Sequence, residues 1–329
     1  MKLILVVLAL LIAVALYVFT WPIPGLEPLA RARALAGPDS GYTTAVASIL
    51  GEAARNTQVI APECRSILLE HGHRTGRVVL FFHGITNCPM QFMRIGQRLY
   101  DSGANVYIPR IPHHGLADRM TTDLANLEAQ EMADFADHEL DLATSLGDTV
   151  VVSGLSLGGV LSAYLAQERE EVGLAVPIAP LLGPAMAPAW AARPLTRLAL
   201  VAPNGFMWWD DKRRENLPGP KRVYPRFATR AMAEIMRLGA IVEDRAANHA
   251  PAARRIVMVT VGKDPAVSNA AIAHLVRAWR SHAPDRVQAY EFPDSMGLGH
   301  DVIDPDQPYQ RVGVVYPILE SILQGGSPR

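Results

Sequence analysis

The sequence predicts an α/β protein in which a mostly parallel sheet carries helices on both faces. Two observations lead to this fold class. From Cys64 onward, short runs rich in β-branched residues alternate with longer segments of helical periodicity, which is how parallel α/β sheets are encoded. The chain has 329 residues, of which 50% are hydrophobic, so it can bury a large core. Because α/β domains are often long, this length does not require two domains.

The charge balance excludes two broad classes of protein. Lys and Arg together number 31 and Asp and Glu 32, which gives a formal net charge of -1. Nucleic-acid binding normally requires a basic face, so we expect no nucleic-acid partner. A high apolar fraction with so small a net charge also excludes disorder for most of the chain.

The N-terminus is an unbroken apolar run from Leu3 to Phe19. As a helix it would be about 26 Å long, close to the roughly 30 Å of a hydrocarbon core. Small-x-small triplets, which are typical of signal cleavage, occur only further on, at 30–32 and 34–36. We therefore expect residues 1–21 to be a membrane anchor with the rest of the chain extracytoplasmic, either periplasmic or extracellular. Secretion after signal cleavage is the alternative, and both interpretations export the main domain.

The remaining elements follow in order. Residues 22–62 are expected to form a connector and an N-terminal extension, with a helix at Thr43–Arg55, and residues 63–329 the main domain. Strands are predicted where β-branched residues cluster, at Ser66–Glu70, Arg77–Phe82, Asn105–Pro109, Thr149–Ser153, Leu174–Ala179, Arg255–Val261 and Val287–Phe292. The clearest helices are predicted where apolar residues recur with helical spacing, at Met90–Asp101, Asp123–Leu146, Leu157–Glu168, Ala270–His282 and Tyr309–Leu323.

One interval interrupts this alternation, between the fifth and sixth predicted strands. A crossover between parallel strands needs only about a dozen residues, and this interval is several times longer. It begins with a stretch rich in Pro and Ala and then carries the aromatic residues Phe206, Trp208 and Trp209. We therefore expect a cap insertion at about 181–253, before the strand Arg255–Val261.

A candidate nucleophile lies in the middle of the predicted sheet. The segment Gly154-Leu155-Ser156-Leu157-Gly158 directly follows an apolar strand pattern and directly precedes a helical pattern. In this G-x-S-x-G context a sharp turn exposes the serine, and the small flanking residues let the backbones approach closely. A serine hydroxyl is a poor nucleophile unless a base activates it and a carboxylate orients that base.

The partners of Ser156 are predicted from chain order, which is serine, then acid, then histidine in this arrangement. Asp264 lies in the turn after the strand Arg255–Val261, where it would reach the same sheet edge as Ser156. His300 follows the last strand. Asp301 and Asp304 are weaker candidates for the orienting acid, because they lie almost beside the histidine in sequence.

The intermediate of such a reaction needs hydrogen-bond donors for its oxyanion. The strand Arg77–Phe82 ends in His83-Gly84-Ile85, a turn that usually supplies one backbone N–H, and the residue after the nucleophile supplies the other. We assign these donors to Ile85 and Leu157.

The motifs HGITNCPMQF, PRIPHHG, GLSLGG, GKDPAVS and GLGHDVI, in this order, resemble the serine hydrolases of the α/β-hydrolase superfamily, close to bacterial carboxylesterases and monoacylglycerol-lipase-like enzymes. The resemblance covers roughly residues 64–323. It implies the α/β-hydrolase fold, a nucleophile at Ser156, an acid at Asp264 and a base at His300, with Ile85 and Leu157 as the oxyanion hole. It also implies that no metal or organic cofactor is needed.

The predicted function is hydrolysis of carboxylic esters through an acyl-enzyme, on small-molecule or lipid-like substrates. A peptidase, a thioesterase or an acyltransferase could use the same triad, so these alternatives remain open. A non-catalytic, membrane-anchored binding protein would predict a damaged triad. Here all three triad positions hold the required residue types.

His83, His114 and Trp208 are candidates for the substrate pocket. For His114 the alternative is packing or hydrogen bonding within its loop, and for Trp208 it is the hydrophobic core of the cap. Cys64 and Cys88 could form a disulfide in an exported protein, or they could be two buried free thiols. Their spacing matches neither a redox motif nor a zinc site.

Overall fold

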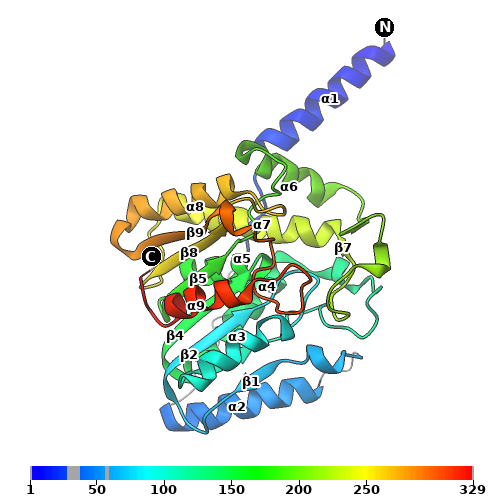
Figure 1. Ribbon diagram of the computed structural model, residues 1–329. Coiled ribbons are helices and arrows are strands. Elements are labelled where there is room, and N and C mark those ends of the chain that lie inside the picture. The colour runs from blue at the N-terminus through cyan, green and yellow to red at the C-terminus, as the bar shows by residue number, and fades with distance from the viewer. Residues whose placement is uncertain (1, 28–37, 56–58, 328–329) are drawn as a thin grey trace.

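The computed structural model describes residues 2–27, 38–55 and 59–327. Its centre is a seven-stranded sheet in the order β1-β3-β2-β4-β5-β8-β9 (Figure 1). Neighbouring strands are parallel, except that β1 runs antiparallel to β3 at one edge. The strands are β1 (Ile67–Leu69), β2 (Thr75–Phe82), β3 (Asn105–Ile108), β4 (Gly147–Leu155), β5 (Val172–Ile178), β8 (Ile256–Val261) and β9 (Val287–Phe292).

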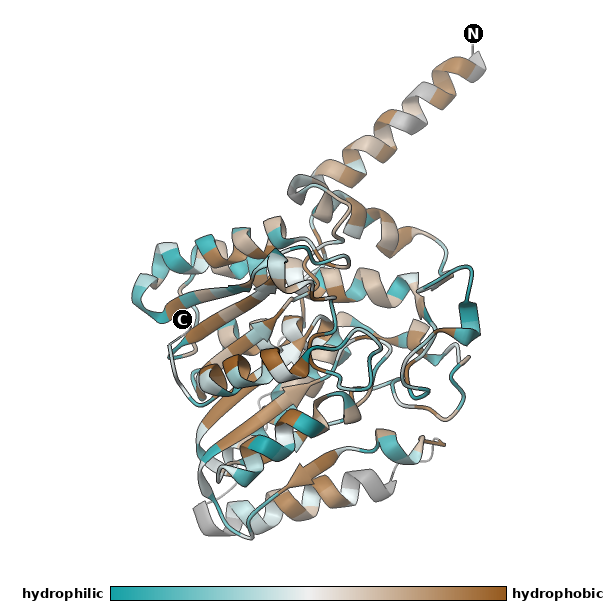
Figure 2. Cartoon of the chain, viewed as in Figure 1, coloured by the Kyte–Doolittle hydropathy of each residue, from teal (hydrophilic) through white to brown (hydrophobic). Residues whose placement is uncertain are grey.

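Helices cover both faces of this sheet. On one face α4, α5, α7 and α8 contact one another in sequence, and on the other face α3 lies against α9 (Figure 1). Parallel strands that are buried on both faces have continuous apolar sequences. Strand β2 accordingly ends in five fully buried residues, 78–82. Figure 2 shows the sheet as the most apolar part of the domain. The helices are α2 (Pro38–Arg55), α3 (Met90–Asp101), α4 (Ala129–Thr144), α5 (Leu157–Glu168), α7 (Thr229–Asn248), α8 (Asn269–His282) and α9 (Val312–Leu323).

The predicted fold class is confirmed, and each predicted strand is present with bounds that differ by at most a few residues. The largest local difference is at 123–146, which was predicted as one helix. The chain forms a short 3-10 helix at Asp123–Asn126 and starts α4 only at Ala129. The break occurs because Leu127 and Glu128 are extended, with ψ angles of 122° and 151°. Leu127 is thereby fully buried.

The apolar N-terminal run forms helix α1 (Lys2–Thr20), which projects from the domain next to α6 (Ala192–Val201) (Figure 1). The Arg197 guanidinium of α6 donates a hydrogen bond of 3.0 Å to the Val18 carbonyl near the end of α1. The predicted membrane-spanning anchor is not supported, since none of the helices described is both long and apolar enough to cross a bilayer. The two triplets considered for signal cleavage lie at 30–36, outside the described residues.

The interval predicted as a cap has two parts. Residues 180–228 contain α6 and a small antiparallel pair, β6 (Phe206–Trp208) and β7 (Arg226–Ala228), which lie outside the central sheet. The following helix α7 contacts α5 and α8, so it belongs to the layer on the sheet. Most of its apolar residues are buried because they face that layer, and Ile235 and Leu238 are fully so.

Candidate active site

The turn between β4 and α5 holds Ser156 in a strained conformation. Its φ and ψ angles are 59° and -108°, a region that residues other than glycine rarely adopt. Two glycines make this turn possible. A Cβ atom on Gly154 would lie 2.4 Å from the Gly158 carbonyl oxygen, and one on Gly158 would lie 1.9 Å from the Phe82 carbonyl oxygen. Strand β2 and the turn that holds Ser156, which we call the serine elbow, thus pack backbone against backbone, as the small residues of the motif predict.

His300 and Asp264 form a hydrogen-bonded pair at the same sheet edge. The distance between His300 Nδ1 and Asp264 Oδ2 is 2.8 Å, and the Asp264 side chain is fully buried. Its other oxygen accepts hydrogen bonds from the backbone N–H groups of Ala266 and Val267, at 2.8 and 3.1 Å. Because a carboxylate oxygen only accepts, Nδ1 carries a hydrogen, so in the neutral imidazole the lone pair lies on Nε2. This pair can therefore take up a proton at Nε2.

The structure pairs His300 with Asp264 and not with the two competing acids. Asp301 accepts a hydrogen bond from Gln91, and Asp304 forms an ion pair with Arg222. Both acids are buried. They hold the loop that follows His300 in place, a role that their nearness in sequence did not reveal.

The predicted oxyanion donors start from adjacent strands at one level. Phe82 at the end of β2 pairs in register with Gly154 of β4, so the turns that carry Ile85 and Leu157 leave the sheet side by side. Leu157 is the first residue of α5, where a backbone N–H has no acceptor inside the helix. The Ile85 N–H also has no protein acceptor among the described residues. Two backbone donors are thus available beside the elbow.

A serine elbow at the carboxyl end of a central parallel strand, with a histidine–aspartate pair at the same edge, is the arrangement of α/β-hydrolase sites. The model of the Alpha/beta hydrolase family matches residues 79–313. The chain belongs to this family.

One sequence relative covers part of the chain. A segment of 106 residues is 29% identical to the thermostable monoacylglycerol lipase of Bacillus sp. (strain H-257). The match covers 30% of this chain and 39% of that relative, so the chain spans less than half the length of the relative it matches.

Solved structures share the fold over most of the chain. One, described as that of LipS and LipT, two metagenome-derived lipolytic enzymes, has a TM-score of 0.59 at 18% identity and covers 81% of this chain and 99% of that one. The monoacylglycerol lipase of Paleococcus ferrophilus has a TM-score of 0.58 at 15% identity, covering 79% and 98%. A soluble variant of the monoglyceride lipase of Saccharomyces cerevisiae has a TM-score of 0.59 at 15% identity, covering 79% and 89%.

Two of the predicted pocket residues are buried inside the loops below the site. Each nitrogen of His83 has a backbone partner: Nδ1 lies 3.0 Å from the Gly84 carbonyl oxygen, and Nε2 accepts from the Ile111 N–H at 3.1 Å. Burial holds the pKa of His83 well below its usual value, and the neighbouring His114 adds to this. His83 is thus a neutral link between the turns after β2 and β3. Burial also lowers the pKa of His114 to about 4.

The third predicted pocket residue, Trp208, lies on β6 with the Arg226 guanidinium 5.9 Å from its ring centroid. Its neighbour Trp209 makes the contact with the site. The Trp209 indole N–H donates to the Thr86 hydroxyl at 3.0 Å, and the Tyr224 backbone N–H donates to the Thr86 carbonyl at 2.8 Å. Thr86 directly follows the predicted oxyanion donor Ile85. The outer segment 180–228 is therefore hydrogen-bonded to the turn at 83–88, which we call the oxyanion turn, and sequence patterns did not indicate this contact.

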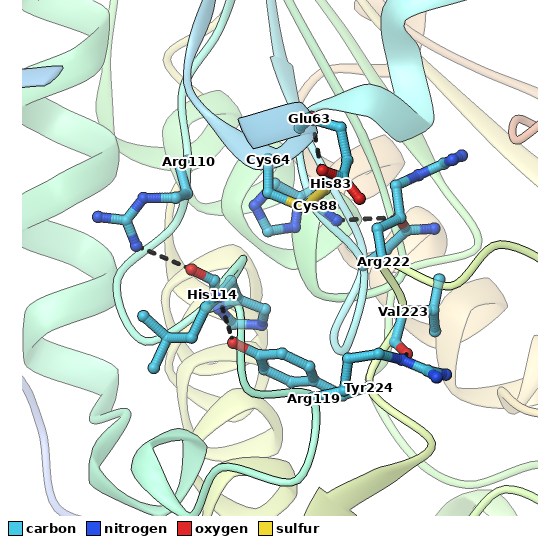
Figure 3. Close-up of a disulfide and its surroundings, with 12 residues drawn as sticks. Glu63, Cys64, His83, Cys88, Arg110, His114, Arg119, Arg222, Val223 and Tyr224 are labelled. Atoms are coloured by element: carbon cyan, nitrogen blue, oxygen red, sulfur yellow. Dashed lines mark hydrogen bonds between the residues drawn. A yellow bond between two sulfur atoms is a disulfide. The ribbon is translucent and has the colours of Figure 1, made fainter. Parts of the chain in front are cut away.

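A disulfide joins Cys64 to Cys88, with a distance of 5.2 Å between the two Cα atoms (Figure 3). Of the two interpretations of these cysteines, the structure therefore supports the disulfide. It ties the segment before β1 to the residue that ends the oxyanion turn. Figure 3 shows His83, His114 and Tyr224 around it. The bond thus anchors the turn at Cys88, two residues after Thr86.

Removing this disulfide is expected to lower the free energy of unfolding by about 3 kcal/mol, because the unfolded chain loses a closed loop. The test is urea unfolding of the Cys64→Ala/Cys88→Ala double variant, with and without a reducing agent. Reductant should destabilise the wild type to the level of the variant and leave the variant unchanged. Equal stability of the oxidised wild type and the variant would contradict the expectation.

His113 forms a partly buried ionic cluster with two acidic side chains, which sequence analysis did not find. Its Nδ1 lies 3.0 Å from Asp123 Oδ2 and its Nε2 lies 2.9 Å from Glu131 Oε2. Only the imidazolium form donates from both nitrogens. The hydrogen bond to Glu131 is the main cause of the raised pKa of His113, and the bond to Asp123 adds to it against the effect of burial.

The raised pKa of His113 makes its contribution to stability depend on pH. The stabilisation is fully present below the unfolded pKa of about 6.5 and is lost as pH rises through the higher folded pKa. We expect His113→Asn to destabilise the protein by about 1 kcal/mol near pH 5.5, since solvent at Glu131 screens part of the interaction, and by less near pH 9. Chemical unfolding at both pH values measures this, with the exposed His274→Gln as control. A difference that grows with pH would contradict it.

Proposed function

We propose that the protein is a serine hydrolase that cleaves carboxylic esters through an acyl-enzyme. The observation that carries the proposal is the His300–Asp264 pair, at 2.8 Å, on the same sheet edge as the strained Ser156. A nucleophilic serine needs such a base held by a buried carboxylate. The backbone donors at Ile85 and Leu157 complete the requirements for acyl transfer.

The proposed reaction has two halves. His300 Nε2 takes the hydroxyl proton of Ser156 as Oγ bonds to the substrate carbonyl carbon, and the carbonyl electron pair moves onto the oxygen between Ile85 and Leu157. When this intermediate collapses, the bond to the alcohol oxygen breaks and the alcohol leaves with the proton from Nε2. Water then attacks the acyl-enzyme in the same way and releases the acid. Asp264 keeps the imidazole oriented and stabilises its positive charge.

Lipid-like esters such as monoacylglycerols are the proposed substrates. Support comes from the names of relatives: the Bacillus protein and two proteins of the same fold are monoacylglycerol or monoglyceride lipases, and another is described as lipolytic. The nearly neutral net charge suits an uncharged substrate.

We also propose that the catalytic domain lies outside the cytoplasm. Structural disulfides form and persist mainly in oxidising compartments, and the Cys64–Cys88 bond beside the oxyanion turn is of this kind. Fractionation of cells that express the full chain, followed by alkylation of free thiols, tests this. Protein that stays in the cytoplasmic fraction with both cysteines alkylated would contradict it.

The proposed chemistry is tested with a fluorophosphonate probe and a substrate panel. The probe should label the purified full chain at one residue, which peptide mapping should identify as Ser156. Hydrolysis of p-nitrophenyl esters and monoacylglycerols should exceed hydrolysis of thioesters and aminoacyl anilides. No labelling of Ser156 would exclude the serine mechanism, while faster cleavage of thioesters or anilides would assign the triad to a thioesterase or a peptidase.

A further inference from the structure

A buried glutamine joins the two loops that carry the oxyanion donor and the base. Gln91, in the first turn of α3, is 2% exposed. Its Oε1 accepts a hydrogen bond of 2.8 Å from the Gly84 N–H, one residue before Ile85. Its Nε2 donates a hydrogen bond of 2.9 Å to Asp301 Oδ2, one residue after His300. One side chain therefore spans from the oxyanion turn to the histidine loop.

Asp301 in turn shapes the loop that follows the histidine. Its Oδ1 accepts from the backbone N–H groups of Ile303 and Asp304, at 3.1 and 3.0 Å. Its Oδ2 accepts one hydrogen bond from the Gln91 side-chain amide and another, of 3.2 Å, from the Gln307 side-chain amide. Each oxygen thus has two donors, so the carboxylate is held by its surroundings and cannot shift without breaking several hydrogen bonds.

A second bridge runs beside the first. The Asn87 side-chain amide donates to Asp304 Oδ2 at 3.2 Å, while Arg222 donates to both oxygens of Asp304 at 2.6 and 2.8 Å. Asp304 is fully buried and the Arg222 side chain is 8% exposed. The same turn and the same loop are therefore joined twice, by an amide and a carboxylate each time.

From this geometry we propose that Gln91 is a positioning residue, which sets the oxyanion turn relative to the histidine loop. The proposal rests on the proposed function. An amide fits because it accepts with one end and donates with the other, as the Gly84 N–H and the Asp301 carboxylate require. Glutamate at this place would face Asp301 with a second negative charge. Since oxyanion donors must match the transition state closely, a small displacement of Gly84 and Ile85 lowers turnover.

The test measures kcat and KM for ester hydrolysis by single and paired variants of the full chain. Gln91→Glu and Asp301→Asn should each lower kcat about 10- to 100-fold with little change in KM, because the turn acts on the transition state. The pair Gln91→Glu/Asp301→Asn exchanges acceptor and donor and should recover most of the lost kcat. If the two side chains did not act through their shared hydrogen bond, the losses would instead be additive.

Gln97→Glu is the matched control. Gln97 lies on the same helix and donates to Asp101 at 2.8 Å in an exposed amide–carboxylate pair. Its variant should keep the wild-type kcat. If Gln91→Glu does not fold, Gln91→Met preserves the length of the side chain without either hydrogen bond and should show the same loss in kcat.

Three outcomes would overturn the positioning role: a kcat for Gln91→Glu equal to that of Gln97→Glu, a rise in KM alone, or a folded double variant no faster than the slower single one. Thermal unfolding of every variant confirms that it is folded. A wild type without Ser156-dependent ester hydrolysis would instead overturn the proposed function, and the positioning role with it.

Discussion

Ser156→Ala is expected to abolish ester hydrolysis, with kcat lower by about 10⁴-fold or more, because no other group can form the acyl-enzyme. The fold should persist. Alanine is smaller than serine and Ser156 lies on a turn whose backbone is fixed by neighbouring strands, for example by the hydrogen bond of 3.0 Å from its N–H to the Ile178 carbonyl. Steady-state hydrolysis of p-nitrophenyl esters, with circular dichroism as the check on folding, measures both.

Ser162→Ala is the control for this variant. Ser162 lies further along α5, is fully buried, and its hydroxyl donates to the Gly158 carbonyl at 2.9 Å. Such a bond within a helix contributes little, so this variant should keep its activity. Equal rates of ester hydrolysis by Ser156→Ala and the wild type would exclude the serine mechanism.

Gly158→Ala is expected to lower the free energy of unfolding by about 3 kcal/mol or more. The new Cβ would lie 1.9 Å from the Phe82 carbonyl oxygen and 2.5 Å from its carbonyl carbon. These are backbone atoms of a central strand, so relief requires moving β2 away from α5. The same movement would displace the oxyanion turn, and activity should fall together with the melting temperature. Thermal unfolding and ester hydrolysis of the purified variant test the prediction.

Gly313→Ala serves as the matched control. Gly313 lies in the first turn of α9, and a Cβ there would meet nothing within 4 Å. Alanine favours a helix over glycine by up to about 1 kcal/mol, so this variant should be as stable as the wild type or slightly more so. A Gly158→Ala protein that unfolds at the wild-type temperature would contradict the close approach of β2 and the elbow.

The oxyanion turn is the most heavily constrained part of the candidate site. Within this turn the Gly84 N–H is bound by the Gln91 side chain, and the Thr86 hydroxyl is bound by Trp209. Asn87 is tied to Asp304 and the next residue, Cys88, to Cys64. Such constraints are expected where catalysis depends on donors held in place before the substrate binds.

Local patterns in the sequence predicted the elements of the fold. Strands such as Val287–Phe292 and helices such as Met90–Asp101 and Leu157–Glu168 have the predicted bounds, because apolar periodicity and β-branched clusters act over a few residues. The long helix predicted at 123–146 was wrong at its start, where burial of Leu127 outweighs helical spacing.

The candidate triad could be predicted for a related reason. Ser156 and Asp264 follow strands directly, and the carboxyl ends of parallel strands meet at one edge. Chain order also favours Asp264 over Asp301 as the partner of His300, and the hydrogen bond between the two side chains agrees with it. The neutral, buried role of His83 needed the structure. The membrane span was predicted from the length of the apolar run alone, and it is not supported among the helices described.

The sequence by itself thus determined the α/β class, the positions of the strands along the chain and the residue types at the serine turn, since each is encoded in short segments of the chain. Only the tertiary structure decided which distant side chains meet. Gln91 and Asp301 are 210 residues apart, and Asn87 and Asp304 are 217 apart. Hydrogen bonds between such pairs depend on the register of the sheet and the course of its loops, and no local pattern records them.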